Sequence, residues 1–375
     1  MITEIKGVLM NRNIPTLKIE GILKINEGHF YELNFTKFEI LDELMAPIVV
    51  NKTLSDERNL RNLNYWFSKR FISSKRKFKK VKELKFNELY PHFLNMSDHY
   101  WIRYDEEEKW EDVSYFYNVP DDSLGKLAFS KNPNINTFYV PYDAPEITTN
   151  GVQDKRWVLK AEMPMGNLYA LRKRNSKKLG TEVYSDILAT AILTKLGLVE
   201  FTPYYLTIDN GEIASECMNF INVDTEMVTA TSLLSVINKK ENETLFETLV
   251  RAGDIYHIPD MKKHLDNIIS VNELLHNEDC NTGNIAFIRD KNGNFLGGSP
   301  IYDFGFAFLT TENNVKNIFE ERRSYLKEKD KIIKMSKKDI KEIIAEYDFG
   351  IDDNKIKDIL FARLGEQEKG VRYTF

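Results

Sequence analysis

Short apolar runs separated by single polar residues occur throughout the first 50 residues, for example at 16–19 and 21–25. Alternation with a period of two places successive side chains on opposite faces of an extended backbone, so these runs predict small strands. Two further runs, 156–163 and 168–174, are also compatible with strands. The segment PMGN (164–167) between them has the composition of a hairpin turn.

A helical pattern follows at residues 182–196, where apolar residues recur three or four positions apart, as Ile187 and Ala191 do. This spacing brings apolar side chains together on a helix. Gly197 follows the pattern directly. Because glycine readily adopts the left-handed conformation that ends many helices, it predicts the C-terminus of this helix.

Strands dominate the earlier part of the chain and helices the later part. Two more strands are predicted at 204–209 and 213–221, and the rest is mainly helical except for 276–309. This order indicates an α+β protein with two lobes. A chain of 375 residues is long for one core. We therefore expect an amino-terminal α/β extension (1–140), a strand-rich lobe (141–221) and a mainly helical lobe (222–375).

The composition is typical of a globular protein, with 42% hydrophobic, 29% charged and 12% aromatic residues. A formal net charge of -5 gives no bulk attraction to nucleic acid, so direct nucleic-acid binding is not expected. The two cysteines, Cys217 and Cys280, form no CxxC pair, which argues against a disulfide framework or a structural zinc site. The sequence shows neither a signal-peptide pattern nor a long apolar run, and it predicts a cytoplasmic protein without a membrane partner.

Residues 68–80, SKRFISSKRKFKK, contain seven Lys or Arg and no acid. Such a run commonly forms a solvated face, and the alternative is contact with an anionic partner or substrate. The acidic segment DEEEKWED (105–112) is its counterpart and could neutralise it within the fold.

Residues 276–308 carry the clearest chemical signal. Asp279 and Asn284 are five apart, and the tripeptide Asp303-Phe304-Gly305 begins 19 residues after Asn284. Phosphoryl transfer requires one carboxylate to orient the attacking hydroxyl, and a second carboxylate with an amide oxygen to hold Mg²⁺ against the phosphates. The pattern D-x-x-x-x-N followed by D-F-G supplies these groups. Asp279 is then the catalytic base, Asn284 and Asp303 are the metal ligands, and ATP and Mg²⁺ are the expected cofactors.

The tripeptide alone is a common turn sequence, and its significance comes from the order and spacing of the whole set. Two apolar strands, 285–288 and 300–302, are predicted to form a hairpin around the turn at 290–294. Gly305 is expected to permit the turn that directs Asp303 into the site.

A kinase also needs a basic residue on a strand to reach the ATP phosphates and a helical acid to pair with it. Glu182 is the obvious acid, and the alternative is that it is only a first-turn acid favoured by the helix dipole. Strand alternation over residues 169–173 places Arg172 and Lys173 on opposite faces and favours Arg172. Lys173 and Lys160 remain candidates.

These motifs resemble those of the HipA-like Ser/Thr kinase family. The segment NEDCNTGNIAF (277–287) resembles its N-x-D-R-H-x-x-N-F/I-G signature, and PIYD (300–303) resembles its metal-binding strand end. TTNGVQDK (148–155) is similar to its phosphate-covering loop, and the helix at Glu182 looks like the one that bears its Lys-pairing acid. SDHYWI (97–102) resembles a subgroup with an extended amino-terminal region.

The resemblance implies a two-lobed protein-kinase-like fold and ATP-dependent phosphorylation of Ser or Thr in a protein target. It also implies self-phosphorylation near Thr148 or Thr149, and an antitoxin or other regulatory protein as a partner. The adenine-binding hinge is expected around Met218 to Phe220. The residues expected to bind the nucleotide are Gly151, Gln153, Lys155, Lys160, Arg172, Lys173, Glu182, Met218 and Phe220.

Two positions depart from the family pattern. Cys280 and Asn281 replace Arg-His after the catalytic Asp, and Arg172 stands where the family has Lys. Arg is not a conservative substitute for a Lys that acts as a point charge. Arg172 therefore leaves open a pseudokinase or nucleotide-sensing module. A small-molecule or lipid kinase is a third hypothesis, suggested only by the basic run at 68–80.

Overall fold

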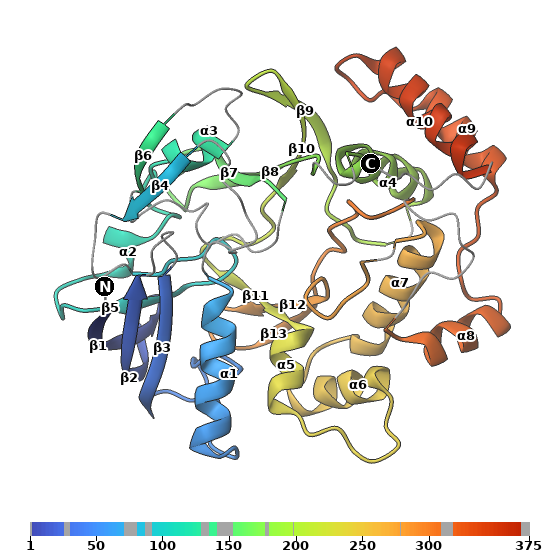
Figure 1. Ribbon diagram of the computed structural model, residues 1–375. Coiled ribbons are helices and arrows are strands. Elements are labelled where there is room, and N and C mark those ends of the chain that lie inside the picture. Colours follow the sequence, from blue (N-terminus) through green and yellow to red (C-terminus); the bar gives the residue numbers. More distant parts are fainter. Residues whose placement is uncertain are drawn as a thin grey trace. The chain divides into compact units, whose positions relative to one another are not determined.

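The computed structural model describes residues 2–25, 31–70, 81–86, 92–128, 135–140, 153–176, 180–197, 199–277, 279–308 and 318–368. Strands predominate before residue 230 and helices after it, which confirms the α+β class (Figure 1). The chain forms two compact units. Unit 1 contains Met1–Arg172, Ile221–Val228 and Arg289–Asn294, and unit 2 contains Lys173–Phe220, Thr229–Ile288 and Phe295–Phe375. The three-part division at residues 140 and 221 stays a prediction.

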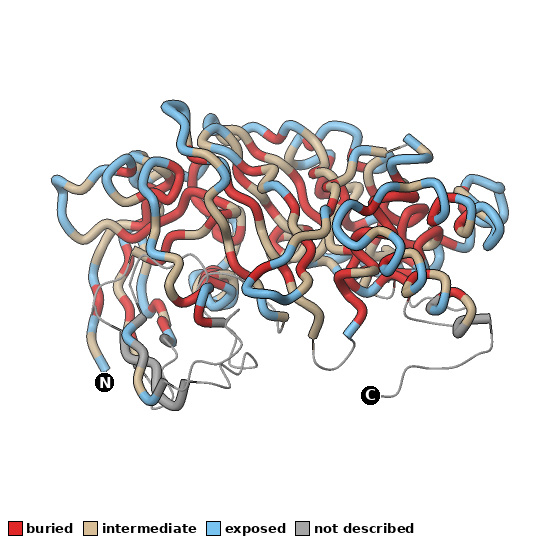
Figure 2. Tube along the Cα trace, turned by 90° about the horizontal axis from the view of Figure 1, so that it is seen from above, coloured by how far each residue is buried: buried red, intermediate tan, exposed pale blue. Residues whose placement is uncertain are grey.

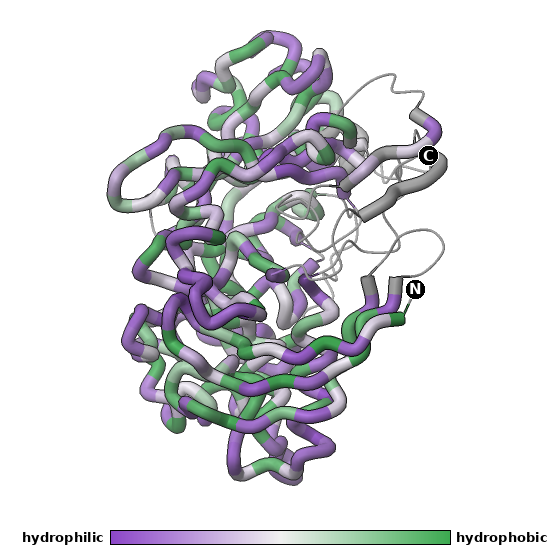
Figure 3. Tube along the Cα trace, turned by 90° about the vertical axis from the view of Figure 1, so that its left-hand side faces the viewer, coloured by the Kyte–Doolittle hydropathy of each residue, from purple (hydrophilic) through white to green (hydrophobic). Residues whose placement is uncertain are grey.

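Unit 1 begins with an antiparallel sheet in the order β3-β2-β1-β5. Its strands are β1 (Ile2–Asn11), β2 (Ile14–Ile25), β3 (Tyr31–Ile40) and β5 (Tyr100–Arg103). Leu17, Ile19 and Leu23 of β2 are buried, and more exposed polar residues lie between them. Figure 3 shows this alternation as purple and green along the strands near the N-terminus. The period of two predicted from the sequence is therefore present.

The runs 16–19 and 21–25 belong to one strand, β2, and the prediction of separate small strands was wrong. The register of β2 against β3 shifts between Glu20 and Gly21. A Cβ atom on Gly21 would lie 2.8 Å from the carbonyl oxygen of Asn34. Because a bulge leaves little space here, glycine lets the strand continue instead of ending.

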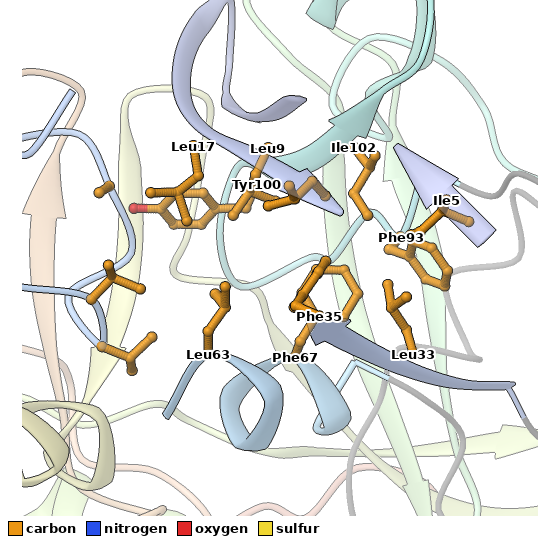
Figure 4. Close-up of a cluster of buried hydrophobic side chains, with 14 of the residues drawn as sticks. Ile5, Leu9, Leu17, Leu33, Phe35, Leu63, Phe67, Phe93, Tyr100 and Ile102 are labelled. Atoms are coloured by element: carbon orange, nitrogen blue, oxygen red, sulfur yellow. The ribbon is translucent and has the colours of Figure 1, made fainter. Parts of the chain in front are cut away.

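The helix α1 (Asp56–Ser68) packs on β3 over a cluster of buried apolar side chains (Figure 4). The ring of Phe67 lies edge-on to Phe35 at 4.9 Å and to Phe93 at 5.2 Å between centroids. Burial of one such side chain contributes about 1.5–3 kcal/mol. The fully buried members are Ile5, Leu9, Leu17, Ile19, Leu23, Leu33, Phe35, Ala46, Val49, Val50, Leu63, Phe67, Phe93, Tyr100 and Ile102.

Polar side chains fix the ends and the position of α1. The Ser55 hydroxyl accepts the N–H of Arg58 at 3.3 Å and so caps the helix. The amide of Asn64 accepts the N–H of Phe35 at 2.7 Å and donates to its carbonyl at 3.0 Å. Since β3 is an edge strand of the sheet, Asn64 satisfies backbone groups that lack a neighbouring strand.

The remaining elements of unit 1 are short. The strands β4 (Val81–Phe86) and β6 (Ile135–Val140) form a parallel pair, and α2 (Trp110–Val113) and α3 (Ser123–Ala128) are brief helices. β7 (Lys155–Ala161) and β8 (Leu168–Arg174) are neighbours in a sheet, which confirms the predicted hairpin. Gly166 lies in its turn with a φ of 117°, and its N–H donates to Met163 at 3.0 Å. The division between the units falls inside β8, after Arg172.

Buried charges hold the two later segments of unit 1 to its amino-terminal part. Arg289 donates through Nε to Glu226 Oε1 at 2.6 Å and also to the Tyr100 hydroxyl. Asn11 donates to Glu226 Oε2 at 2.8 Å and accepts from Arg12 at 2.8 Å. We call Asn11, Arg12, Tyr100, Glu226 and Arg289 the Glu226 network. It joins residues more than 200 positions apart in the sequence.

The start of the basic run has a structural role. Arg70 is buried, donates to the Phe93 carbonyl at 2.8 Å and forms an ion pair with Asp98. Residues 71–80 lie outside the described residues. Their balance with the acidic segment 105–112 therefore stays a prediction.

Unit 2 is mainly helical. Its strands β9 (Tyr205–Asp209) and β10 (Glu212–Met218) form an antiparallel pair where strands were predicted at 204–209 and 213–221, although β10 ends three residues before Ile221. α4 contacts β9, β10, α9 and α10, and α7 contacts α6 and α8. No helix within the described ranges is long and apolar enough to cross a membrane. The helices of this unit are α4 (Glu182–Leu196), α5 (Ala230–Val236), α6 (Leu245–Ile255), α7 (Met261–Leu274), α8 (Glu320–Glu328), α9 (Lys337–Glu346) and α10 (Asp353–Glu368).

The helix α4 has the bounds that the sequence predicts. Gly197 has a φ of 60°, and its N–H donates to Leu193 at 3.0 Å, so the helix ends in a left-handed cap. Most residues of the helix up to Leu193 are buried, whichever face they occupy. A helix buried all round belongs to the interior of its unit. Each unit has such an interior, and buried stretches of chain are red in Figure 2.

The turn predicted at 290–294 is confirmed. The N–H of Asp290 donates to the Asn294 carbonyl at 2.8 Å, and its carboxylate accepts the N–H of Asn294 at 2.8 Å. These bonds close the hairpin between β12 (Ala286–Asp290) and β13 (Phe295–Gly298). A further short strand, β11 (Thr225–Thr229), precedes α5.

The second strand of that hairpin was predicted at 300–302, and this was wrong. The chain re-enters a strand at once after the turn, as β13. Ile301 instead forms an isolated parallel bridge with Phe201. The bridge matters for the site, because it places the segment before Asp303 beside the segment before Tyr204.

Candidate active site

Five segments of unit 2 supply the candidate site. They are the end of β8, the helix α4, the segment that follows it up to Tyr204, the stretch around Asp279 and the stretch around Asp303.

The loop after α7 is fixed by Asn277. Its amide oxygen accepts the N–H of Asp279 at 3.2 Å, and its amide nitrogen donates to the Asp303 carbonyl at 3.4 Å. The hydroxyl of Tyr302 donates to the Gly283 carbonyl at 3.2 Å. The two halves of the sequence motif are therefore side by side, and the spacing argument that joined them is consistent with the fold.

Two amides orient the Asp279 carboxylate. Asn281 donates to Oδ1 at 2.7 Å and Asn284 donates to Oδ2 at 3.1 Å. Cys280 between them is buried, and burial raises the pKa of its thiol to about 12. It is therefore a neutral packing residue at neutral pH. Asn281, which stands where the family pattern has His, therefore braces the Asp279 carboxylate.

The orientation of Asn284 matters for cation binding. Its amide nitrogen donates to the Asp279 carbonyl at 3.0 Å as well as to the carboxylate. The amide oxygen is therefore the group that this side chain can present to a cation. Mg²⁺ prefers oxygen ligands of this kind.

Asp303 has a left-handed backbone with a φ of 66°, which is uncommon for a residue other than glycine. Its N–H donates to the Tyr204 hydroxyl at 3.1 Å, and its Oδ1 lies 2.9 Å from Lys173 Nζ. The side chain is 27% exposed, so solvent reaches it. The strained conformation lies at Asp303 itself. Gly305 instead gives room, since a Cβ there would lie 3.3 Å from the Cβ of Glu182.

Lys173 occupies the centre of the site. It is 1% exposed, its Nζ lies 3.0 Å from Asp186 Oδ2, and the Tyr204 ring centroid lies 4.4 Å from Nζ. Burial opposes the charge, but Asp186 and Asp303 outweigh it, and the pKa of Lys173 is raised well above its ordinary value. Lys173 therefore stays charged. We call Lys173, Asp186, Tyr204 and Asp303 the Lys173 network.

The sequence reasoning missed Asp186. This residue lies one helical turn after Glu182 on α4 and is fully buried. Burial raises the pKa of its carboxyl, and Lys173 together with the Ser215 hydroxyl, which donates at 2.8 Å, partly offsets this. The available signal was its position four residues after Glu182, since i and i+4 share a helix face.

Glu182 makes contacts that fit the alternative hypothesis, in which it is only an acid in the first turn of the helix. Its Oε2 accepts the backbone N–H groups of Ser176 at 3.1 Å and Thr181 at 3.0 Å. Thr181 is the N-cap of α4 and Ser176 lies six residues before Glu182, so Glu182 connects the segment that precedes the helix to its first turn. A role of Glu182 towards the nucleotide stays a prediction.

Several other residues predicted to bind the nucleotide belong to unit 1 or lie outside the described residues. Gln153, Lys155, exposed Lys160 and half-buried Arg172 belong to unit 1, and their roles stay predictions. Gly151 lies outside the described residues, as do Thr148 and Thr149.

The predicted hinge belongs to unit 2. β10 ends at Met218, which is exposed. Phe220 follows, with its ring centroid 5.7 Å from that of Tyr302. Since Tyr302 directly precedes Asp303, the predicted hinge lies beside the segment that carries the predicted metal ligand. Adenine binding there stays a prediction.

The donors of the site suit a hard cation. Within the described parts of the chain, no three His, Cys, Asp or Glu side chains cluster as a metal site would require. The set here is instead one carboxylate, Asp303, and one amide oxygen, Asn284. Such a set suits Mg²⁺, which commonly keeps several waters and uses few protein ligands beside substrate phosphates.

No protein-family model and no curated protein matches this chain. Among solved structures, the proinflammatory kinase CtkA of Helicobacter pylori is similar at 17% identity and a TM-score of 0.39, over 59% of this chain and 90% of that one. HipA of Shewanella oneidensis, in a complex with HipB and operator DNA, is similar at 12% identity and a TM-score of 0.36, over 60% of this chain and 65% of that one. The second bears the name of the family that the sequence motifs resemble. At TM-scores below 0.5, neither likeness bears on the chemistry of this chain.

Proposed function

We propose that this chain is an ATP- and Mg²⁺-dependent kinase of the HipA-like type that phosphorylates Ser or Thr of a protein. The observation that carries the proposal is the buried, charged Lys173, held 2.9 Å from Asp303 in the unit that also contains Asp279 and Asn284. A charged lysine beside a half-buried carboxylate, together with a second, oriented carboxylate, supplies groups that phosphoryl transfer needs.

In this proposal Asp279 is the acceptor of the substrate proton. The hydroxyl oxygen of the target forms a bond to the γ-phosphorus, the bond from that phosphorus to the bridging oxygen breaks, and ADP leaves. The hydroxyl proton passes to Asp279, which Asn281 and Asn284 keep oriented. Both of these hydrogen bonds come from amide groups, which orient the carboxylate without transferring a proton to it.

Lys173 supplies positive charge for the nucleotide phosphates. To reach them, it must exchange its contact with Asp303 for one with phosphate, while Asp186 keeps its other contact. Asn284 and Asp303 would hold Mg²⁺, which when bound neutralises phosphate charge. When the nucleotide and Mg²⁺ bind, Lys173 would contact phosphate and Asp303 would contact the metal.

Lys173 also bears on the two alternatives. The pseudokinase hypothesis rested on Arg172 as the residue that replaces the family Lys, and a buried Lys beside Asp303 weakens that reason. The lipid-kinase hypothesis rested on the basic run, of which residues 71–80 lie outside the described residues. Nucleotide binding without turnover would favour the first alternative, and phosphate transfer to a lipid but not to a protein would favour the second.

The same proposal includes a protein target, a regulatory partner such as an antitoxin, self-phosphorylation and a cytoplasmic location. They are supported only by the resemblance of the motifs and by the composition. That the chain does not bind nucleic acid directly also stays a prediction, based on its net charge of -5.

The test is transfer of labelled phosphate from ATP to the chain itself and to a generic protein substrate. Wild type should incorporate label only with Mg²⁺, and Asp279→Asn should lose about 10²- to 10⁴-fold, as removal of a general base does. The exposed Asp254, changed to Asn, is the matched control and should keep full activity. Equal incorporation by wild type and Asp279→Asn would refute the assignment. Nucleotide-dependent stabilisation without turnover would favour the binding module.

A further inference from the structure

We infer that Tyr204 is a positioning residue of the proposed kinase site. Its hydroxyl fixes the backbone of the metal-ligand candidate Asp303, and its ring fixes the ammonium group of Lys173. The inference rests on the proposed function, because it concerns the metal and nucleotide affinity of that site.

The hydroxyl acts on a strained backbone. Asp303 has a φ of 66°, and its N–H donates to Tyr204 Oη at 3.1 Å. A residue other than glycine in this region loses about 1 kcal/mol or more relative to an ordinary conformation, and it persists only where its surroundings hold it. The Tyr204 hydroxyl is such a restraint. It determines where the Asp303 carboxylate points, because the side chain follows the backbone.

The ring acts on the cation. Lys173 Nζ lies 4.4 Å from the centroid of the Tyr204 ring, within the range of a cation–π interaction. The two carboxylates around Lys173, Asp186 and Asp303, lie at 3.0 and 2.9 Å. The ring is thus a third, uncharged contact. It stays in place when Lys173 exchanges Asp303 for a phosphate.

Tyr204 is itself firmly held. Its N–H donates to Thr190 Oγ1 on α4 at 2.9 Å. Just before it, Thr202 donates to the Ile301 carbonyl at 2.8 Å, and Ile301 donates to the Glu200 carbonyl at 3.0 Å. Tyr204 therefore connects α4, which carries Asp186, to the segment that leads into Asp303.

The hydroxyl is also chemically suited to this role. Tyr204 is 4% exposed, and its Oη accepts the Asp303 N–H. A Phe at this position would keep the ring and lose this hydrogen bond.

The test compares Tyr204→Phe with Tyr205→Phe in the full chain. Tyr205 is adjacent in sequence and 58% exposed, which makes it a matched control. The readout is the affinity for Mn²⁺ as a probe of the metal site, measured by electron paramagnetic resonance with a non-hydrolysable ATP analogue present. Tyr204→Phe should weaken Mn²⁺ binding about tenfold or more, as loss of an outer-shell partner does. Tyr205→Phe should match wild type.

A second variant separates the two roles. Tyr204→Leu removes the ring as well, so it should also weaken binding of the metal-free analogue, whereas Tyr204→Phe should leave that binding unchanged. Unfolding temperatures are measured for each variant. An unchanged Mn²⁺ affinity in Tyr204→Phe would overturn the inference. So would equal weakening of Mn²⁺ and metal-free analogue binding together with a lower unfolding temperature, because that marks a purely structural role.

Failure of the proposed function gives a different pattern. Wild type itself would then bind neither Mn²⁺ nor the analogue and transfer no phosphate, and the inference about Tyr204 would fall with it. If wild type binds and transfers phosphate, only the comparison of Tyr204→Phe with Tyr205→Phe decides the role of Tyr204.

Discussion

The two units each bury charged side chains, but they differ in how far solvent reaches those charges. In the Glu226 network of unit 1, the side chains of Glu226 and Arg289 are 1% and 3% exposed. In the Lys173 network of unit 2, Lys173 and Asp186 are equally buried, but Asp303 is 27% exposed. The Glu226–Arg289 pair is closed to solvent, whereas solvent reaches the Lys173 network at Asp303. We call the two the closed and the open network.

This difference distinguishes a structural from a functional use of buried charge. Removing ions from water is unfavourable, and a buried pair is tolerated only when its partners are complete. The Glu226–Arg289 pair is hydrogen-bonded and almost fully buried, and its network joins segments distant in sequence. The Lys173 network places one cation between two carboxylates, of which Asp303 is half-buried and reached by solvent. A site of this kind can accept a cation or exchange partners with a phosphate.

The largest expected effect is on the closed network. Arg289→Met leaves Glu226 buried without its cation and should lower the free energy of unfolding by about 3–5 kcal/mol. Denaturant unfolding measures this. The control is Lys291→Met, which removes an ion pair with Asp224 whose side chains are 58% and 53% exposed. That change should be worth about 0–1 kcal/mol. Equal effects of the two substitutions would contradict the closed-network description.

The second-largest expected effect is a pH dependence of the free energy of unfolding, caused by His99 in unit 1. Burial, with the charge of Arg12, lowers the pKa of His99 to about 4, and its Nε2 donates to the carbonyls of Asn222 and Thr225. Between pH about 6.5 and 4 the unfolded chain binds a proton that the folded chain does not, so stability falls as pH falls. The loss over this window is at most about 3 kcal/mol.

Measurement of unfolding free energy from pH 7 to pH 4 tests this sign. Burial also lowers the pKa of His264 to about 4, so His99→Gln removes one of two such groups within the described residues and should reduce the slope over that window by about half. If stability of wild type rose on acidification, or if the slope in His99→Gln equalled that of wild type, the neutral buried state of His99 would be wrong.

Substitutions in the open network, which is the Lys173 network, should change the rate of phosphate transfer. Lys173→Met should reduce phosphate transfer about 100-fold, because a preorganised charge at the phosphates is lost. Lys173→Arg should not rescue it fully, since a guanidinium is planar and larger. Lys195→Met is the control, because Lys195 forms an exposed ion pair with Glu346 in the same unit. Full activity of Lys173→Met would transfer the role to Arg172 or Lys160.

The smallest effect is expected at the brace of the catalytic loop. Asn281→Ala removes one hydrogen bond to Asp279 from an exposed donor and should lower kcat about fivefold, in line with about 1 kcal/mol for one hydrogen bond. Asn281→His introduces the residue type that the family pattern has there and should retain more activity than Asn281→Ala. A steady-state comparison of kcat tests this. Identical kcat values in wild type and Asn281→Ala would remove Asn281 from the site.

Local signals predicted the local structure well. The bounds of α4 follow from apolar spacing and from Gly197, and the turn at 290–294 follows from its composition. Local signals failed where a strand continued through an irregularity. Gly21 lets β2 continue where two separate strands were predicted. After the turn at 290–294 the chain enters β13 directly, so the prediction of a strand at 300–302 was wrong.

The choice of the basic residue shows a different limit. Alternation assigns Arg172 and Lys173 to opposite faces, but it does not say which face meets the site. Tyr169 and Ala170 are both buried although they are neighbours, so a period of two does not hold along β8. Only the position of Asp303 selects Lys173.

Contacts between distant segments could not be predicted at all. Nothing local relates Glu226 to Asn11, which lies 215 residues earlier. Asp186 was overlooked because Glu182 satisfied the same pattern one turn earlier. The motif spacing did relate Asp279, Asn284 and Asp303, whose neighbourhood Asn277 and Tyr302 connect in the fold. Their catalytic roles stay a prediction.

The most direct test of the open network is calorimetric titration of Mg²⁺ with a non-hydrolysable ATP analogue into wild type and Asp303→Asn. Wild type should bind Mg²⁺ together with the analogue. Asp303→Asn should bind them at least about tenfold more weakly, because it removes the Asp303 carboxylate, which is the proposed metal ligand. Equal affinity of the two proteins would contradict the account.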